Sequence, residues 1–315
     1  MPGWISQYRK DVYSQVKYLQ GLRLPKSGCI RSGLFVGSGD SYTCALLMEY
    51  LSKHTMLAYY PSDLLHCPQM LSDHEIFFIS ASGRTRSNIE AAKIARKFEI
   101  KTTAVTARSK SALGEACSNT INLDYLHHGQ SSNTGILEFT ATVITCMALI
   151  GININLNSLD RIMNDARSQV NLYGVDLTRR PPSILFLGGG ISYPLASYGA
   201  FKMHELFGFR SFGYLLDDYY HSPIFSLKKS DCVFVLDHSN VKNSMSANFH
   251  NQLKKIHNRS YYFQPKVRQS LFEQILFSIF VVQILSLTIA ENLEIDKPYY
   301  LSNKKILKLS SSLIY

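Results

Sequence analysis

One stretch of the sequence combines hydroxyl side chains with a glycine in a pattern that suits an anion. The stretch Ser80-Ala-Ser-Gly-Arg-Thr85 lies between an apolar run at 76–79 and a helical pattern. At such a junction the helix N-terminus offers free backbone N–H groups and the positive end of its dipole, and Gly83 lets the backbone turn closely around a ligand. Helix capping would explain a single hydroxyl, whereas Ser80, Ser82 and Thr85 together favour a phosphate group.

A second group of residues could move protons. Lys202 and Glu205 are three positions apart in a helical pattern, so their side chains lie on one face of the helix. His221 comes sixteen residues after Glu205, and Pro223 ends the local structure and exposes the imidazole. Proton transfer beside a sugar carbonyl requires such groups, one base at carbon and one acid or base at the ring oxygen. A surface ion pair beside an unrelated histidine is the alternative.

Three familiar motifs are incomplete. In Gly37-Ser-Gly-Asp-Ser-Tyr42, Tyr42 stands where a dinucleotide fingerprint has its third glycine, and no ribose-binding acid follows about 20 residues later. The sequence has no Gly-rich loop ending in Gly-Lys-Ser/Thr, and Gly39-Asp-Ser-Tyr-Thr43 lacks the closing glycine of a nucleophile elbow. Dehydrogenases, P-loop NTPases and serine hydrolases are therefore disfavoured.

Strand and helix patterns alternate along the chain and must position these groups. An amphipathic helix opens the chain at residues 4–19. Short apolar runs predict strands at 34–36, 56–59, 76–79, 102–105, 121–123, 184–187 and 231–236. Helical patterns lie at 42–52, 88–98, 136–150, 158–173, 193–207, 242–257 and 269–292. This alternation predicts parallel sheets covered by helices on both faces.

An internal repeat divides the chain. The nine residues 34–42 return as residues 185–193 with six identities, so an apolar strand runs into Gly-x-Gly and a helix twice. We predict two domains of one fold. Residues 1–155 hold the opening helix and the domain with the phosphate-binding turn, and residues 156–315 hold the domain with Glu205 and His221 and a C-terminal tail. At the matching strand end of the second domain Asp237 would repel a phosphate, so the two copies should differ in function.

Composition limits the classes of protein. The 315 residues are 46% hydrophobic and 18% charged, which excludes a disordered or collagen-like chain, and a net charge of +10 admits nucleic acid, an acidic membrane or a phosphorylated small molecule as partner. Six cysteines stand singly without a secretory signal, so we expect a cytoplasmic protein without a zinc site or disulfide framework. The uncharged run 274–290 is slightly short for a membrane span and is interrupted by polar residues, which predicts a buried core helix.

In combination these motifs resemble the double sugar isomerase (SIS) domains, in particular the isomerase half of glucosamine-6-phosphate synthase. The similarity extends from about residue 28 to residue 310. It implies an α/β fold of two similar flavodoxin-like domains, each a parallel sheet flanked by helices. It also implies that Ser80, Ser82, Gly83 and Thr85 hold the sugar phosphate together with Ser41. The catalytic base would be Glu205 with Lys202 beside it, and the ring-opening residue would be His221, reached across a dimer interface.

The sequence departs from that family in three places. The family's tail Pro-x-x-Leu-Ala-Lys is here Pro298-Tyr-Tyr-Leu-Ser-Asn303-Lys304, so the lysine that engages the sugar carbonyl is replaced by Asn303 or displaced to Lys304. A polar Ser-Thr-Lys turn corresponds to residues 135–137, Gly-Ile-Leu. The sequence has no glutaminase domain and no N-terminal cysteine nucleophile, so we expect no glutamine amidotransferase activity.

The resemblance implies an enzyme acting on a hexose or hexosamine 6-phosphate by proton transfer between C1 and C2. It would be a phosphosugar isomerase, or an isomerase-deaminase of the glucosamine 6-phosphate or fructose 6-phosphate type. We expect a homodimer without metal or organic cofactor, and neither nucleic acid nor membrane as partner. Two alternatives remain: a phosphoglucose/phosphomannose isomerase, and a non-catalytic sugar-phosphate sensor. Such a sensor usually carries a DNA-binding helix-turn-helix, for which the roughly 27 residues before the first domain are too few.

Overall fold

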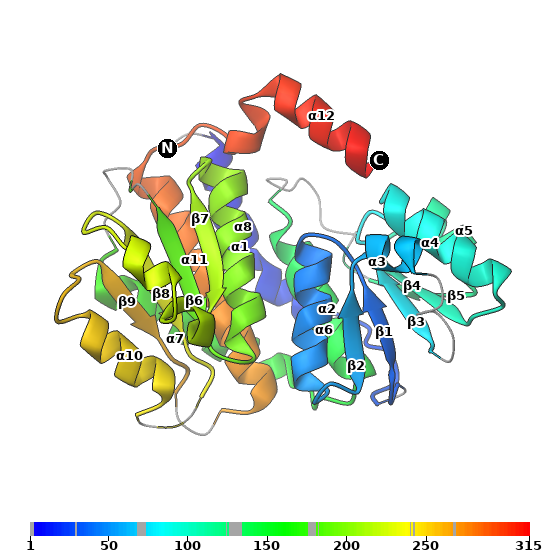
Figure 1. Cartoon of the computed structure of the whole chain (residues 1–315), viewed down its shortest axis with the longest axis horizontal. Helices are drawn as coiled ribbons and strands as arrows, with labels where there is room; N and C mark the ends of the chain where they lie inside the picture. The colour runs from blue at the N-terminus through cyan, green and yellow to red at the C-terminus, as the bar shows by residue number, and fades with distance from the viewer. Residues whose placement is uncertain are drawn as a thin grey trace. The chain divides into compact units, whose positions relative to one another are not determined.

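The computed structural model contains two parallel β-sheets, each in a compact unit of its own (Figure 1). It describes residues 3–28, 30–67, 74–123, 125, 134–175, 181, 183–239, 241, 243–266 and 269–315. The first-sheet unit comprises Lys17–Gln130, Leu137–Ile154 and Lys304–Tyr315, and the second-sheet unit comprises Met1–Val16, Ser131–Ile136 and Asn155–Asn303. This division differs from the predicted 1–155 and 156–315, because residues 1–16 and 131–136 belong to the second-sheet unit and residues 304–315 belong to the first-sheet unit.

The first sheet has five parallel strands in the order β2-β1-β3-β4-β5. β1 spans Gly33–Val36, β2 Met56–Tyr59, β3 Ile76–Ile79, β4 Thr102–Thr106 and β5 Asn119–Asn122. Every residue of β1, β3 and β4 is buried, as expected of central strands that carry helices on both faces. The predicted α/β class with a parallel sheet is confirmed.

Helices cover both faces of the first sheet. α2 spans Asp40–Leu51, α3 Pro61–His66, α4 Arg86–Lys97, α5 Ala112–Ala116 and α6 Ile136–Leu149. Side chains alternate along a strand, so Leu34 and Val36 point to one face and Phe35 points to the other. Leu34 and Val36 share a core cluster with residues of α3, α4 and α5. Phe35 is fully buried on the opposite face, which α2 and α6 cover (Figure 1).

The strands that follow β1 in the sequence are added on opposite sides of it, so the strand order of the first sheet reverses at β1. β2 pairs with one side of β1 and β3 with the other, so the connections that follow β1 and β3 leave the sheet in opposite directions. In open parallel sheets, ligands bind at the carboxyl edge where this reversal occurs. Ser41 lies in the first turn of α2, which follows β1, and residues 80–85 follow β3. The two predicted phosphate-binding segments therefore flank the reversal.

The second sheet repeats this plan with four parallel strands in the order β7-β6-β8-β9. β6 spans Ile184–Gly188, β7 Ser211–Leu215, β8 Cys232–Leu236 and β9 Ser260–Phe263. The helices of this unit are α7 (Leu159–Tyr173), α8 (Ser192–Phe207), α9 (Leu216–Tyr219), α10 (Met245–Leu253), α11 (Leu271–Asn292) and most of α1 (Gly3–Gln20). β6 takes the place that β1 has in the first sheet.

The internal sequence repeat is a repeated strand–turn–helix connection. A β-carbon placed on Gly37 would lie 2.7 Å from the carbonyl carbon of Ser41, and one placed on Gly188 would lie 2.4 Å from that of Ser192. Both glycines therefore let the first turn of the following helix approach the strand end. The repeated identities preserve this close approach, and the prediction of two similar domains is confirmed.

The long apolar helix α11 forms the centre of the second-sheet unit. Its length and composition would allow it to cross a membrane, yet every residue in the range 274–287 is buried inside the unit. Gln283 Oε1 accepts a hydrogen bond from Gln15 Nε2 at 2.7 Å, and the hydroxyls of Ser286 and Tyr8 lie 2.6 Å apart. Because Gln15 and Tyr8 belong to α1, these bonds attach the opening helix to α11. The prediction of a buried core helix is confirmed.

Candidate functional site

The phosphate turn, defined here as Ser80–Thr85, joins β3 to α4. Ser80 Oγ lies 3.0 Å from Thr85 Oγ1 and accepts the backbone N–H of Gly83 at 3.2 Å. Ser82 Oγ accepts the backbone N–H of Arg84 at 3.3 Å. Thr85 is the N-cap residue of α4, but its side chain makes no capping hydrogen bond. Helix capping therefore does not account for this hydroxyl group, and the structure brings the predicted residues together.

The backbone of the phosphate turn is fixed at Gly83, whose φ is +63°. A β-carbon at this position would lie 2.0 Å from Ser111 Oγ, so only glycine fits. The N–H of Leu113 donates to Gly83 O at 3.1 Å, and the N–H of Ala107 donates to Ala81 O at 3.1 Å. The turn is thus held in place by the chain that follows β4.

Ser41 lies next to the phosphate turn along the carboxyl edge of the first sheet. It is half-buried in the first turn of α2, and its backbone N–H donates to Ser38 O at 3.1 Å. Val36 of β1 pairs with Phe78 of β3, so the chains leaving the two strands start side by side. Within the part of the chain that the structure describes, the Ser41 hydroxyl has no hydrogen-bond partner. It is available to a ligand at this edge.

The matching edge of the second sheet is occupied by an acidic network. Asp237 directly follows β8 and is 3% exposed. Its carboxylate accepts hydrogen bonds from the N–H of Ser239 at 2.8 Å, from the hydroxyl of Tyr262 at 2.7 Å and from the hydroxyl of Ser244. A buried carboxylate disfavours an anionic ligand. The first sheet thus carries hydroxyl groups at this edge and the second sheet carries a buried carboxylate, which is the difference that the sequence predicted.

The predicted proton-transfer pair lies on α8, in the second-sheet unit. Lys202 Nζ donates to Glu205 Oε2 at 2.6 Å. The side chain of Lys202 is 2% exposed, whereas that of Glu205 is 46% exposed. A carboxylate that is open to solvent is thus held in place by a buried cation, which is an arrangement suited to a general base.

The buried ammonium of Lys202 is enclosed by groups that sequence reasoning missed. It lies 5.4 Å from the centroid of the Tyr198 ring and 3.5 Å from the carbonyl oxygen of Thr134. The hydroxyl of Tyr198 accepts a hydrogen bond from Gln283 Nε2 at 3.2 Å. Tyr198 lies one helical turn before Lys202, so helical spacing could have identified it. Thr134 is brought here by the tertiary fold and has no such signal.

Two tyrosines respond to the charges of this pair. Burial raises the pKa of Tyr300, and the Glu205 charge raises it further while the Lys202 charge opposes the rise. Burial also raises the pKa of Tyr8, with the hydrogen bond between Tyr8 and Ser286 as the main opposing effect. Both phenols are therefore neutral over the physiological range. Sequence reasoning missed Tyr300, although it lies within the tail segment 298–304.

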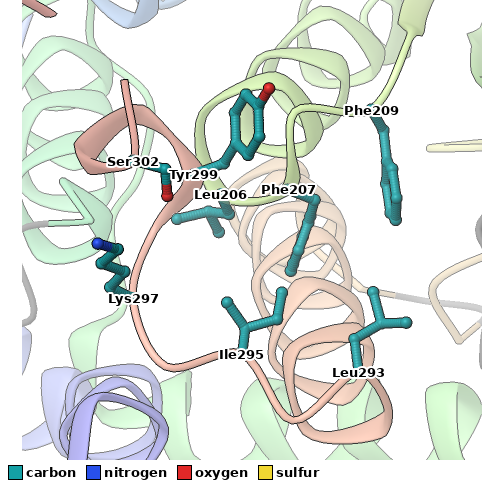
Figure 2. A pocket seen from close by; sticks show the side chains of 8 residues that line it. All are labelled: Leu206, Phe207, Phe209, Leu293, Ile295, Lys297, Tyr299 and Ser302. Carbon is teal, nitrogen blue, oxygen red and sulfur yellow. The ribbon is translucent and has the colours of Figure 1, made fainter. Parts of the chain in front are cut away.

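The chain that follows α11 packs against the last turn of α8, which comes directly after Glu205. A pocket of about 250 Å³ lies there, and Figure 2 shows the side chains around it. Its lining is mostly apolar and consists of Leu206, Phe207, Phe209, Leu293, Ile295, Lys297, Tyr299 and Ser302. Because Leu206 directly follows Glu205, the tail lies beside the end of the helix that carries the proton-transfer pair.

His221 lies in an exposed turn between α9 and the short 3-10 helix Pro223–Ser226. Its backbone N–H donates to Asp218 O at 3.2 Å, and its ring centroid lies 5.2 Å from that of Tyr220. Neither contact involves Glu205. The exposure of the imidazole agrees with its sequence context, and its action together with Glu205 stays a prediction.

The structure also locates Lys304 and residues 135–137, where the sequence differs from the family it resembles. Lys304 is exposed, begins α12 (Lys304–Ile314) and belongs to the first-sheet unit, so its role at the sugar carbonyl stays a prediction. Ile136 is buried as the first residue of α6, and no side chain of 135–137 supplies the polar groups of the family's turn. The neighbouring Thr134 offers a backbone carbonyl to Lys202 instead.

The described residues offer no obvious metal centre. Among them, no group of three or more His, Cys, Asp or Glu side chains is arranged to hold a metal ion. The first-sheet unit presents hydroxyl and N–H donors that suit an anion, and the second-sheet unit presents a solvent-accessible base. Binding an anion and moving a proton are the two chemical tasks that these groups can perform.

The chain is similar to several known proteins. It is 23% identical over 225 residues to the glutamine–fructose-6-phosphate aminotransferase (isomerizing) of Sulfolobus acidocaldarius, covering 68% of this chain and 38% of that protein. The enzyme of the same name from Corynebacterium diphtheriae is 24% identical over 182 residues, covering 50% of this chain and 28% of that protein. The chain therefore spans about a third of the length of these curated relatives.

Solved structures share the fold at low sequence identity. Glucosamine-6-phosphate deaminase of Thermotoga maritima has a TM-score of 0.69 at 15% identity, covering 93% of this chain and 94% of that one. The tagatose-6-phosphate ketose/aldose isomerase of Escherichia coli has a TM-score of 0.66 at 17% identity, covering 92% and 90%. The C-terminal domain of glucosamine-fructose-6-phosphate aminotransferase from Francisella tularensis has a TM-score of 0.66 at 14% identity, covering 95% and 98%. Residues 29–151 and 177–263, which include both sheets, match the SIS domain, and the chain belongs to the SIS domain family.

Proposed function

We propose that the chain is a phosphosugar enzyme that transfers a proton between C1 and C2 of a hexose or hexosamine 6-phosphate, acting as a homodimer in the cytoplasm. The observation that carries this proposal is the 2.6 Å contact between the half-exposed carboxylate of Glu205 and the buried ammonium of Lys202. The names of similar proteins support it, because they include an isomerizing aminotransferase, a glucosamine-6-phosphate deaminase and a ketose/aldose isomerase.

Binding of the substrate would use the donors of the first-sheet unit. The hydroxyls of Ser80, Ser82 and Thr85, with Ser41, would bind the phosphate oxygens. The N-terminus of the 12-residue helix α4 supplies further N–H groups and the positive end of a dipole. Neutral donors and a helix dipole hold a phosphate dianion without placing a cation at the reacting carbons.

The proton transfer then follows from Glu205. For an aldose, the carboxylate takes the proton from C2, the released electron pair forms the C1–C2 double bond, and the oxygen on C1 is protonated to give an enediol. Glu205 returns the proton to C1 while the hydroxyl on C2 loses its proton and becomes the ketone. Lys202 holds the carboxylate in position throughout. His221 of the partner subunit would open the sugar ring by moving a proton at the ring oxygen.

An amino group at C2 would change only the intermediate. The same proton transfer then gives an enamine, which becomes an imine at C2 and releases ammonia when water adds. Isomerisation and deamination therefore need the same base and the same phosphate site. A non-catalytic sugar-phosphate sensor is the second candidate, and it needs the phosphate turn but gives Glu205 no task.

The test is incorporation of solvent deuterium at C1 or C2 of fructose 6-phosphate and glucosamine 6-phosphate. We expect exchange with the wild type and a loss of about 10² to 10⁴ in its rate with Glu205→Gln, which keeps the shape and removes the base. The matched control is His204→Gln, because His204 is exposed on the same helix and should leave exchange unchanged. Equal exchange in Glu205→Gln would place the base elsewhere. Absence of exchange in the wild type, with sugar phosphate still bound, would favour the sensor.

A further inference from the structure

A second pocket opens in the first-sheet unit at the carboxyl ends of β4 and β5. Its volume is about 660 Å³. Arg108, Lys110 and Ser111 come from the connection after β4, Asn122 and Leu123 come from the end of β5, and Arg84 comes from the phosphate turn. None of the lining residues that the structure describes is acidic.

This pocket is separate from the place where the sugar phosphate is proposed to bind. The phosphate turn follows β3 and Ser41 follows β1, the two strands between which the strand order reverses. Ser41, Ser80 and Thr85 do not line the second pocket, and Ser82 is the hydroxyl of the turn that does. Of the four hydroxyls assigned to the sugar phosphate, the two places therefore share only that of Ser82.

Three cationic side chains line the pocket. Arg84, Arg108 and Lys110 are exposed, and none of them forms an ion pair with any residue that the structure describes. The guanidinium of Arg84 lies 5.0 Å from the centroid of the Tyr315 ring, a cation–π contact that restrains it at the rim. Like charges gathered at one pocket repel one another, and an anion bound among them removes that cost.

The lining also contains surface that a bare anion cannot use. Ala107, Ala112 and Leu123 are apolar, while Ser109 and Ser111 offer hydroxyls and Asn122 offers an amide. A volume of about 660 Å³ is within the range of pockets that hold organic ligands, about 300 to 1,000 Å³. Guanidinium and ammonium groups with hydroxyls are the donors that phosphate recognition uses.

We propose that this pocket binds an organic phosphate of nucleotide size as a second ligand, simultaneously with the sugar phosphate at the phosphate turn. Arg108 and Lys110 bind its phosphate, Arg84 closes the side toward the turn, and the apolar lining contacts its organic part. Because the two ligands share the segment 82–84, occupancy of one site is sensed at the other. The site is a place for an effector and needs no residue of the proton-transfer pair.

Calorimetric titration tests the proposal with inorganic phosphate and adenosine 5′-monophosphate as probes. In wild type saturated with fructose 6-phosphate, we expect both probes to bind still, with the nucleotide tighter than inorganic phosphate. Arg108→Gln with Lys110→Gln should weaken both probes by about tenfold or more and change fructose 6-phosphate affinity by less than about twofold. The matched control is Lys93→Gln with Lys97→Gln, which removes the same charge from exposed positions on α4 outside the pocket and should change neither.

The outcomes separate this inference from the proposed function. Unchanged probe affinity in the Arg108 and Lys110 variant, displacement of the nucleotide by fructose 6-phosphate, or a nucleotide that binds no tighter than inorganic phosphate would each overturn the inference. Ser80→Ala with Thr85→Ala should abolish fructose 6-phosphate binding and leave the nucleotide site intact. If the wild type binds the nucleotide through Arg108 and Lys110 but does not bind fructose 6-phosphate, the inference stands and the proposed function fails.

Discussion

Ser192 Oγ lies 3.1 Å from Nδ1 of His238 at the carboxyl edge of the second sheet. In the internal repeat Ser192 takes the place of Ser41, whose hydroxyl has no such partner among the described residues. Burial lowers the pKa of His238 against the effect of the nearby Asp237 charge, so a neutral imidazole occupies this position. In the second copy the serine hydroxyl is thus hydrogen-bonded to His238, whereas in the first copy the hydroxyl of Ser41 is available to a ligand.

The first prediction compares these two serines. Ser41→Ala should weaken binding of fructose 6-phosphate by about 1.5 to 3 kcal/mol, the value of one hydrogen bond to a charged group. Ser192→Ala removes a hydroxyl from the matching turn and should leave that affinity unchanged. Calorimetric titration of both variants checks this, and equal effects of the two substitutions would refute the assignment of the phosphate to the first sheet.

The proton-transfer pair should respond asymmetrically to removal of either partner. Glu205→Gln takes the counter-charge from an ammonium that is 2% exposed, so we expect a loss of about 1 to 3 kcal/mol in the free energy of unfolding. Lys202→Met keeps the packed stem and leaves Glu205 to be hydrated, so the loss should stay under about 1 kcal/mol although activity falls. Urea denaturation measures both values. A greater loss for Lys202→Met would contradict this account.

The sharing of a site across a dimer can be tested by mixing inactive variants. If His221 serves the Glu205 of the partner subunit, a heterodimer of Glu205→Gln and His221→Ala contains one site in which both residues are wild type. Unfolding and refolding an equal mixture should restore about a quarter of wild-type activity, because half of the dimers are mixed and each mixed dimer has one such site. Either variant refolded alone is the control. A mixture no more active than its components, or a fully active monomer in sedimentation, would contradict the prediction that the two subunits share a site.

Gly83 should be far less tolerant of a side chain than Gly39. Both glycines have positive φ, +63° and +57°, a region that L side chains disfavour, so alanine strains the backbone at either position. A β-carbon at Gly83 also meets Ser111 Oγ at 2.0 Å, whereas Gly39 has no atom within 4 Å. Gly83→Ala should therefore lower the denaturation midpoint more than Gly39→Ala. Equal losses would mean that Ser111 can move aside.

Histidine burial should make the second-sheet unit sensitive to acid. Burial lowers the pKa of His250 from 6.5 to about 4, with the Lys254 charge as a smaller cause, and its Nδ1 lies 2.9 Å from Ser260 Oγ. Below the unfolded pKa of 6.5 the unfolded chain takes up a proton that the folded chain refuses. The free energy of unfolding therefore falls as pH drops from 6.5 toward about 4 and does not depend on this group at higher pH. Urea denaturation at about pH 7 and about pH 5 should show a smaller fall for His250→Gln than for the wild type.

The sequence predicts the central strands better than the edges of the sheets. β1, β3, β6 and β8 are continuous apolar runs because both of their faces are buried. β7 was missed because Ser211 is its one fully buried residue and no apolar run marks it. β5 was predicted from Ile121 but starts at Asn119, since its polar, mostly exposed residues carry little pattern. Edge strands are defined by hydrogen bonds to a neighbour, which local sequence does not record.

The candidate site shows the same division between local and long-range information. The Ser80–Thr85 contact and the Lys202–Glu205 pair follow from turn chemistry and helical spacing, and both are present. Thr134 is far from Lys202 in the sequence, so no spacing rule could pair them. Tyr300 could not be weighed, because its relation to α8 depends on how the tail folds back after α11.

The attachment of α1 to α11 governs when the second-sheet unit can be completed during synthesis. The Tyr8–Ser286 and Gln15–Gln283 hydrogen bonds join residues 278 and 268 positions apart. All five strands of the first sheet, in contrast, lie between residues 33 and 122 and can pair as soon as that segment has left the ribosome. The apolar face of α1 emerges before α11 and must wait for residues 21–270, which lie between them, to be synthesised. During that interval the nascent chain exposes a hydrophobic helix face, to which chaperones can bind.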